Sequence, residues 1–106
     1  MTDMPVHKRL TEASFRKDPQ FKALCQAFVH CQSEKDVADF LRDIATLGEL
    51  QSMSERLEVA RLLAEGKSYR EIAKMTGAST TTVTRVAKFL EDGQGGYKRY
   101  LKKKTA

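Results

Sequence analysis

Apolar residues recur at steps of three and four along most of the chain, which is the spacing of one face of an α-helix. Three successive helical faces follow from this pattern: Phe21, Leu24, Cys25, Phe28 and Val29; then Val37, Phe40, Leu41 and Ile44; then Leu57, Val59, Ala60, Leu62 and Leu63. β-Branched residues do not alternate with polar residues anywhere in the sequence, so the pattern of a half-buried strand is missing. The sequence therefore predicts an all-α protein.

Residues typical of helix starts precede each of these faces. Asp18 can cap a helix whose first residue is Pro19, a position where the missing N–H costs nothing. Ser33 can cap the second helix in the same way. Two starts remain open for the third helix, because Thr46–Glu49 and Ser52–Glu55 both have the spacing of a capping box.

The chain has 106 residues, of which 41% are hydrophobic and 31% are charged, a composition typical of one globular domain. We expect dimerisation helices over about 7–66, a helix-turn-helix over 68–91 and a basic tail over 97–106. The stretch over about 7–17 is expected to be a weakly patterned helix. No apolar stretch is long enough to span a bilayer or to form the core of a signal peptide, which favours a cytoplasmic protein without membrane contact.

The helices have more apolar surface than a monomer of this length can easily bury, because short chains bury a small fraction of their surface on folding. The problem is sharpest in the N-terminal half, which contains Phe15, Phe21, Phe28 and Phe40. A two-fold homodimer would bury these rings. We therefore expect a homodimer.

Residues 68–91 have the features of a helix-turn-helix. Gly66 can end the preceding helix in the left-handed conformation, and Ser68–Glu71 forms a capping box for a short helix. We expect the inward contacts of that short helix to come from Ile72, Ala73 and Met75. Gly77 then lies where the chain must turn sharply.

The second helix of the motif can be capped by Ser79 or Thr80, and its expected buried stripe is Val83, Ala87 and Leu90. Its outer face is then formed by hydroxyl and basic side chains, which are Thr80, Thr81, Thr84, Arg85 and Lys88. Residues 78–90 include no Asp or Glu, and the net charge is +6 over 51–106 against −1 over 1–50. Double-stranded DNA is the expected partner, because this part of the motif meets base edges in the major groove.

At these residues the sequence resembles the tryptophan-repressor superfamily, and more closely its branch of small tryptophan-repressor-like proteins of the YerC/YecD type. The matching segments are 56–60, 66–72 and 76–86, within a similarity that extends from about Phe15 to Leu101. The resemblance implies an intertwined, all-helical homodimer that represses transcription by binding a palindromic operator. It also implies that Arg70 reaches a guanine and that Thr82 contacts a phosphate.

The resemblance also places three threonines of the second helix of the motif. Thr80 and Thr81 occupy base-facing positions that are apolar in the repressor, and Thr84 lies near the bases. We expect the whole DNA-contacting set to be Arg70, Ser79, Thr80, Thr81, Thr82, Thr84, Arg85 and Lys88.

The corepressor site of the family is matched only in part. Thr46, Arg56 and Arg85 correspond to the threonine and the two arginines that hold tryptophan in the repressor. Val86, however, replaces the glycine that leaves room for the indole ring, and overpacking such a slot is costly. We expect a vestigial effector site that does not use tryptophan as a corepressor, and no other cofactor.

Other chemistry has little support in the sequence. His7, His30, Cys25 and Cys31 lack the spacing of a metal site, and Cys25 is expected to be a small core residue. The sequence contains no phosphate-binding loop and no nucleophile elbow, so no motif indicates an enzyme. Two alternative functions stay open: a helix-turn-helix recognition subunit of larger machinery, similar to a sigma factor or a transposase, and a helical adaptor that binds protein.

The basic tail from Tyr97 to Lys104 has two interpretations. In the first it is a solvated, unstructured terminus. In the second, Tyr97, Tyr100 and Leu101 pack on the body of the protein while the lysines contact flanking phosphates.

Overall fold

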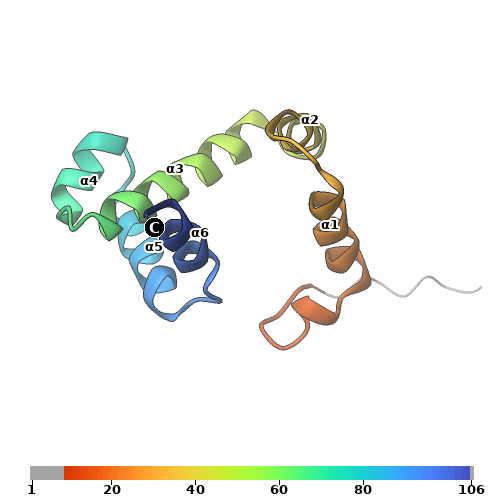
Figure 1. Ribbon diagram of the computed structural model, residues 1–106. Coiled ribbons are helices and arrows are strands. Elements are labelled where there is room, and N and C mark those ends of the chain that lie inside the picture. Colours follow the sequence, from red (N-terminus) through yellow and green to blue (C-terminus); the bar gives the residue numbers. More distant parts are fainter. Residues whose placement is uncertain (1–8, 106) are drawn as a thin grey trace, which may run out of the picture. The chain divides into compact units, whose positions relative to one another are not determined.

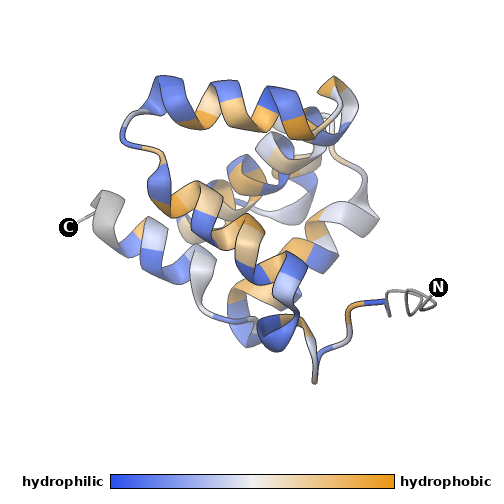
Figure 2. Ribbon diagram, turned by 90° about the vertical axis from the view of Figure 1, so that its right-hand side faces the viewer, coloured by the Kyte–Doolittle hydropathy of each residue, from blue (hydrophilic) through white to orange (hydrophobic). Residues whose placement is uncertain are grey.

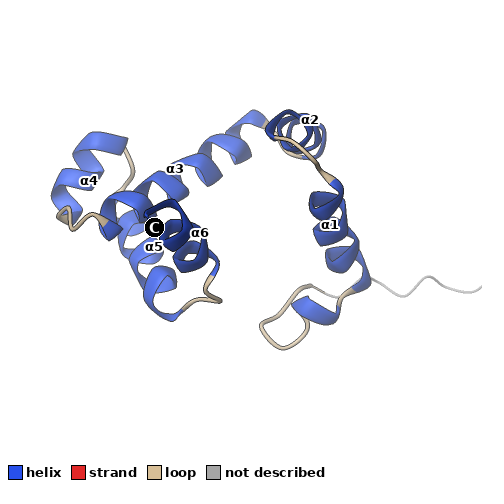
Figure 3. Cartoon of the chain, viewed as in Figure 1, coloured by secondary structure: helices blue, strands red, loops and turns tan. Residues whose placement is uncertain are grey.

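The computed structural model describes residues 9–105, with side chains from Arg9 to Lys102. This range contains no strand. Its elements are one 3-10 turn, η1 (Phe15–Lys17), and the helices α1 (Pro19–His30), α2 (Glu34–Ile44), α3 (Leu47–Ala64), α4 (Tyr69–Thr76), α5 (Thr80–Asp92) and α6 (Gly96–Thr105) (Figures 1 and 3). The prediction of an all-α protein is confirmed. Contacts divide the chain into two compact units, one ending at Ile44 and the other beginning at Ala45.

The first unit contains η1, α1 and α2. As expected, Asp18 caps α1, since its carboxylate accepts a hydrogen bond of 2.9 Å from the N–H of Phe21. Ser33 accepts a hydrogen bond of 3.0 Å from the N–H of Asp36 at the start of α2. Each helix thus begins where the sequence predicts it.

The aromatic rings of the first unit meet in two edge-to-face pairs. The ring centroids of Phe15 and Phe21 are 5.6 Å apart, and those of Phe28 and Phe40 are 5.2 Å apart. None of the described residues of this unit is buried, and Val29 is 82% exposed. Cys25 is exposed too, so its prediction as a core residue is wrong for this chain taken alone.

The prediction of a helix over about 7–17 is wrong for residues 9–14. The hydroxyls of Thr11 and Ser14 bond to backbone groups there: each accepts a hydrogen bond of 3.1 Å from the other residue's N–H. Such local bonds compete with the helical hydrogen bonds of the backbone. Only Phe15–Lys17 form a single 3-10 turn.

The second unit contains α3 to α6. The start of α3 is the Thr46 box and not the Ser52 box, because the Thr46 hydroxyl accepts from the N–H of Glu49 at 3.1 Å while the Glu49 carboxylate accepts from the N–H of Thr46 at 2.8 Å. The N–H of Thr46, and to a lesser extent its hydroxyl, lowers the pKa of Glu49 below its ordinary value. Ser52 lies inside the helix.

One apolar core holds the second unit together. Both α4 and α5 pack on α3 and on each other, and α6 also contacts α3 (Figure 1). Hydrophobic and hydrophilic residues alternate along these helices (Figure 2), and the buried apolar residues are Val59, Ala60, Leu62, Ile72, Ala78, Val83, Val86 and Leu101. Among residues 9–105, no helix has the length and apolar composition needed to cross a membrane.

Gly66 ends α3 as the sequence predicts. Its φ is +88°, and the two N–H groups that follow the helix bond back to it, Gly66 to the carbonyl of Leu63 at 3.0 Å and Lys67 to the carbonyl of Leu62 at 3.1 Å. This closure satisfies carbonyls that would otherwise lack a partner at the helix end. The chain then turns directly into α4.

The inward face of α4 differs from the prediction at one residue. Ile72 is fully buried and Ala73 is half-buried, but Met75 is 59% exposed. Thr76, one turn after Ile72 on the same face, is half-buried instead, and its hydroxyl donates a hydrogen bond of 2.7 Å to the carbonyl of Ile72. In a helix of only 8 residues, this displaces Met75 to the surface.

The C-terminal segment forms a helix that packs on the core, so the interpretation of it as an unstructured terminus is wrong for the described part. Leu101 is buried in α6, and Tyr97 packs against the core cluster. Tyr100, which was expected to pack as well, is 48% exposed. The amine of Lys98 donates a hydrogen bond of 3.3 Å to the carbonyl of Glu91 near the end of α5.

Candidate nucleic-acid interface

The turn between α4 and α5 depends on Gly77, whose φ of +79° lies in the left-handed region. The N–H of Gly77 donates a hydrogen bond of 2.9 Å to the carbonyl of Ala73, which ends α4. Ala78, the next residue, is buried in the core, and its N–H donates to the Thr76 hydroxyl at 3.1 Å. The crossing of the two helices is therefore fixed by backbone bonds and by apolar contact.

The first turn of α4 is held by the expected capping box. The Ser68 hydroxyl accepts a hydrogen bond of 3.1 Å from the N–H of Glu71, and the Glu71 carboxylate accepts one of 3.2 Å from the N–H of Ser68. The N–H of Ser68, and to a lesser extent its hydroxyl, lowers the pKa of Glu71 below its ordinary value. Arg70 lies in this same first turn with an exposed side chain.

The first turn of α5 is capped by Ser79, one of the two candidates that the sequence offered. Its hydroxyl accepts a hydrogen bond of 3.0 Å from the N–H of Thr82 and donates one of 3.1 Å to the Thr82 hydroxyl. Both hydroxyls are thus engaged with the helix end. Ser79 and Thr82 differ in this respect from the other hydroxyl residues of α5.

The outer face of α5 is exposed over its whole length. Five side chains that were predicted to contact DNA are at the surface: Thr80, Thr81, Thr84, Arg85 and Lys88. Val83 and Val86 anchor the opposite face, at 0% and 3% exposure. Ala87 and Leu90, expected beside Val83, are only half-buried, and Val86 takes the deeper position. The helix therefore presents hydroxyl and basic groups outward and valines inward.

Carboxylates lie near these basic side chains in the sequence, since Glu71 follows Arg70, and Glu91 and Asp92 lie three and four residues after Lys88. Among the described residues, no ion pair joins Arg70, Arg85 or Lys88 to an acidic side chain. Arg61 on α3 is the contrast, because Glu58 and Glu65 both bind its guanidinium and raise its pKa. Unpaired basic groups on one face are suited to a polyanionic partner.

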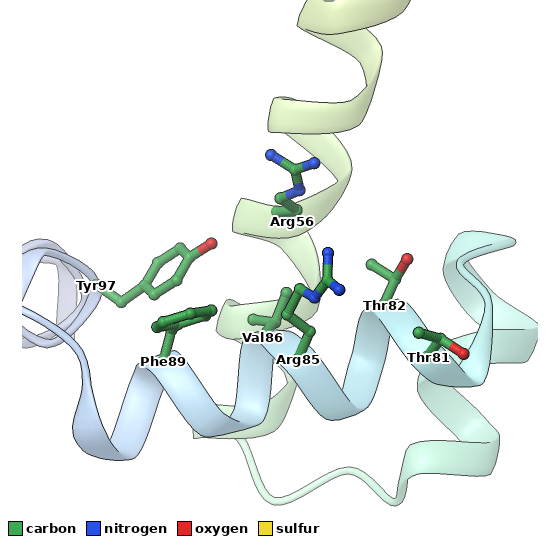
Figure 4. A pocket seen from close by; sticks show the side chains of 7 residues that line it. All are labelled: Arg56, Thr81, Thr82, Arg85, Val86, Phe89 and Tyr97. Atoms are coloured by element: carbon green, nitrogen blue, oxygen red, sulfur yellow. The ribbon is translucent and has the colours of Figure 1, made fainter. Parts of the chain in front are cut away.

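A hollow of about 350 Å³ lies beside this face, between α3, α5 and α6 (Figure 4). We call it the Arg56–Arg85 hollow, and its lining is formed by Arg56, Thr81, Thr82, Arg85, Val86, Phe89 and Tyr97. Three of the four expected effector-site residues, Arg56, Arg85 and Val86, thus meet here. Thr46 is not among them; it caps α3 ten residues before Arg56, about 15 Å along the helix axis.

The sequence did not identify Phe89 or Tyr97 as site residues. Phe89 is 50% exposed and lines both the hollow and a shallower depression of about 430 Å³ on the outer face of α5. It lies one turn after Arg85 on the same face, so helical spacing was a signal for it. Tyr97 comes from a different helix, and only the packing of α6 brings it to the hollow that Arg85 also lines.

Metal ligands do not gather anywhere in the described part of the chain. No three His, Cys, Asp or Glu side chains lie together within residues 9–105. Cys25 and Cys31 are free thiols, and His7 lies outside the described residues.

Comparison with known proteins finds similar sequences over most of the chain. Residues 19–105 match the family model of the Trp repressor protein. The protein YerC of Bacillus subtilis (strain 168) is 43% identical over 83 residues, which cover 76% of this chain and 80% of YerC. A Trp operon repressor homolog of Xylella fastidiosa (strain M23) is 30% identical over 91 residues, which cover 85% of this chain and 97% of that protein.

The fold is shared with solved structures as well. The crystal structure of a TrpR-like protein from Eubacterium eligens ATCC 27750 has a TM-score of 0.79 and a sequence identity of 38%, with 82% of this chain and 90% of that chain covered. Sequence and fold thus agree over the helix-turn-helix and most of the remaining helices. The chain belongs to the Trp repressor family, as a TrpR-like protein of the YerC type.

Proposed function

We propose that this protein is a sequence-specific DNA-binding transcriptional repressor that acts as a homodimer on a palindromic operator. One observation supports it above the others: α5 is capped by Ser79, anchored by Val83 and Val86, and exposes threonine and basic side chains from Thr80 to Lys88, a segment without an acidic residue. Membership of a repressor family supports the same function. The protein would act in the cytoplasm, where DNA is accessible.

In this proposal the first turns of α5 enter the major groove, which is the docking mode of the helix-turn-helix. Thr80, Thr81 and Thr84 would contact base edges, because a threonine hydroxyl can bond a base and its methyl group can contact a thymine. Arg85 and Lys88 would contact phosphates or guanine. Arg70, exposed in the first turn of α4, would reach a guanine from the other side of the turn.

Ser79 and Thr82 have a different role in this proposal. Since the Ser79 hydroxyl bonds both the N–H and the hydroxyl of Thr82, the two residues orient α5 and leave base recognition to the exposed threonines. Thr82 is also half-buried, which suits a phosphate contact beside the groove better than a base contact within it. The base preference would then depend on Thr80, Thr81 and Thr84.

The homodimer is supported by apolar surface that the chain does not cover by itself. In the first unit, Phe28, Val29 and Ile44 are 38%, 82% and 55% exposed. In the second unit, Met53 and Leu57 on α3 are 43% and 39% exposed. Scattered exposed apolar residues are ordinary, but a unit without a buried residue is unusual and fits an obligate interface.

Selection of bound duplexes from a random DNA library tests the function. We expect the purified protein to enrich a palindrome whose half-sites are about one helical turn apart, since a two-fold dimer presents two copies of α5. A matched variant, Lys35→Gln in the first unit, removes an exposed charge far along the sequence from the motif and should enrich the same palindrome. If the protein enriches no sequence and does not bind duplex DNA in a salt-dependent way, the proposed function is wrong and the alternative of a protein-binding adaptor is favoured.

The oligomeric state is tested separately by analytical ultracentrifugation. Leu57→Asp should raise the dissociation constant of the dimer at least about tenfold, because an unpaired charge is costly to bury. Ser52→Asp changes an exposed polar position of the same helix and should leave the dimer intact. A wild-type protein that sediments as a monomer at all concentrations would rule out the homodimer.

A further inference from the structure

We propose that α6 forms a second DNA-binding surface, independent of base sequence, whose exposed basic side chains contact backbone phosphates outside the segment read by α5. This inference rests on the proposed function. It concerns the exposed face formed by Lys98, Arg99 and Lys102, which we call the α6 basic face.

The α6 helix has a fixed inner side. Leu101 is only 6% exposed within the core, and Tyr97, one turn earlier on the same side, packs against the core cluster. This pair determines which residues point outward, because successive residues of a helix are rotated by about 100°. Lys98, Arg99 and Lys102 lie away from the Tyr97–Leu101 side, and all three are exposed.

The α6 basic face is of one sign. From Gly93 to the C-terminus the sequence contains no Asp or Glu, and Lys103 and Lys104 add to the positive charge. Ordinary solvated helices mix both signs, as α2 does, where Lys35 and Asp39 form an ion pair of 2.7 Å. Like charges along one helix repel each other, so the composition of α6 is suited to an anionic partner.

Two contacts attach α6 to the recognition helix. The Lys98 amine bonds the Glu91 carbonyl near the end of α5, and Tyr97 lines the Arg56–Arg85 hollow together with Arg85 and Phe89 (Figure 4). The two helices therefore belong to one packed unit. A duplex bound along α5 would leave its flanking backbone near α6.

The chemistry of the face favours phosphates over bases. Lysine and arginine side chains on an exposed helix can neutralise phosphates without reading sequence. Each neutralised phosphate releases condensed counterions, which makes affinity dependent on salt. Tyr100, half-exposed beside these residues, offers a hydroxyl donor to the same backbone.

The test is fluorescence anisotropy with a duplex of random sequence and with the selected operator, over a series of salt concentrations. The variant R99Q/K102Q/K103Q/K104Q keeps Tyr97 and Leu101 but removes four charges. We expect the slope of log affinity against log salt to become shallower by about 3.6, since each of the four lost contacts contributes about 0.9. The loss should be equal for both duplexes, so the preference for the operator is unchanged.

The control variant R9Q/K17Q/K22Q/K35Q removes the same number of charges from exposed positions of the first unit and should keep the wild-type slope. An α6 variant that keeps the wild-type slope overturns this inference while the proposed function stands. A changed dimerisation constant with an unchanged slope overturns it as well, in favour of a contact between copies of the chain. Absence of duplex binding by the wild-type protein would instead contradict the proposed function.

Discussion

The hydroxyl of Ser79 donates a hydrogen bond of 3.1 Å to the hydroxyl of Thr82 and accepts one of 3.0 Å from the Thr82 N–H, so the two residues close the first turn of α5. The two residues between them, Thr80 and Thr81, are left exposed at the helix start. The same four-residue segment thus contains a capping pair and a surface pair. These pairs should respond differently to substitution.

Ser79→Ala removes the cap and should lower the free energy of unfolding by about 1 kcal/mol. It should weaken binding to all duplexes by a similar factor, because a frayed α5 presents every contact less well. Thr81→Ala should leave stability unchanged and reduce the preference for the operator over random DNA about five-fold, since one base contact is lost. Thermal unfolding and anisotropy titrations measure the two effects, and a Ser79→Ala variant with altered preference would contradict this division.

Gly77→Ala should lower the free energy of unfolding by about 1–2 kcal/mol, because a Cβ is unfavourable in the left-handed region. Apart from Gly77 itself and its two chain neighbours, no residue has an atom within 4 Å of the position that the new Cβ would take, so the cost comes from the backbone conformation and not from a clash. Denaturant unfolding gives the value. Gly48→Ala, inside the first turn of α3, is the control and should raise stability by about 0.5 kcal/mol, since alanine favours a helix.

Acid should weaken the capping box of α4. The Ser68 N–H, and secondarily the Ser68 hydroxyl, holds the pKa of Glu71 below 4.5 in the folded protein. A lowered folded pKa stabilises the fold above the unfolded pKa, and this contribution is lost as the pH falls through the folded value. The wild-type protein should therefore have a higher Tm than Glu71→Gln near neutral pH, and the difference should shrink below pH 4.5.

Circular dichroism melts of both proteins across the acidic range measure this difference. Both retain Glu49, whose pKa is lowered in the same way at α3, so its titration cancels in the comparison. A difference in Tm that is constant with pH would mean that the Glu71 charge does not contribute.

L-Tryptophan should change the affinity for the operator by less than about two-fold, because a molecule that does not bind shifts no equilibrium. Val86 forms part of the wall of the Arg56–Arg85 hollow, although a volume of about 350 Å³ remains beside it. Anisotropy with saturating tryptophan, and with alanine as a matched amino acid, checks the expectation. A large increase in affinity with tryptophan alone would show that the valine does not close the site.

Much of the second unit was predictable because its signals are local. The Ser68–Glu71 box, the left-handed Gly66 and Gly77, and the valine-anchored α5 all depend on bonds within one turn of the chain. The resemblance to the tryptophan-repressor superfamily, which rests on the same segments, is confirmed by the matched relatives. The prediction failed where helical periodicity competed with local side-chain bonding. At Thr11 and Ser14, hydrogen bonds from the side chains to the backbone replace the predicted helix.

The sequence by itself determined the helical class, the caps, the turn at Gly77 and the family, because periodicity and capping are properties of neighbouring residues. Only the tertiary structure decided that Thr76 replaces Met75 on the inner side of α4, that Val86 lies deeper than Ala87, and that Tyr97 lines the same hollow as Arg85. These outcomes depend on how helices distant in the sequence pack against one another, and close packing selects among side chains that helical spacing leaves nearly equivalent.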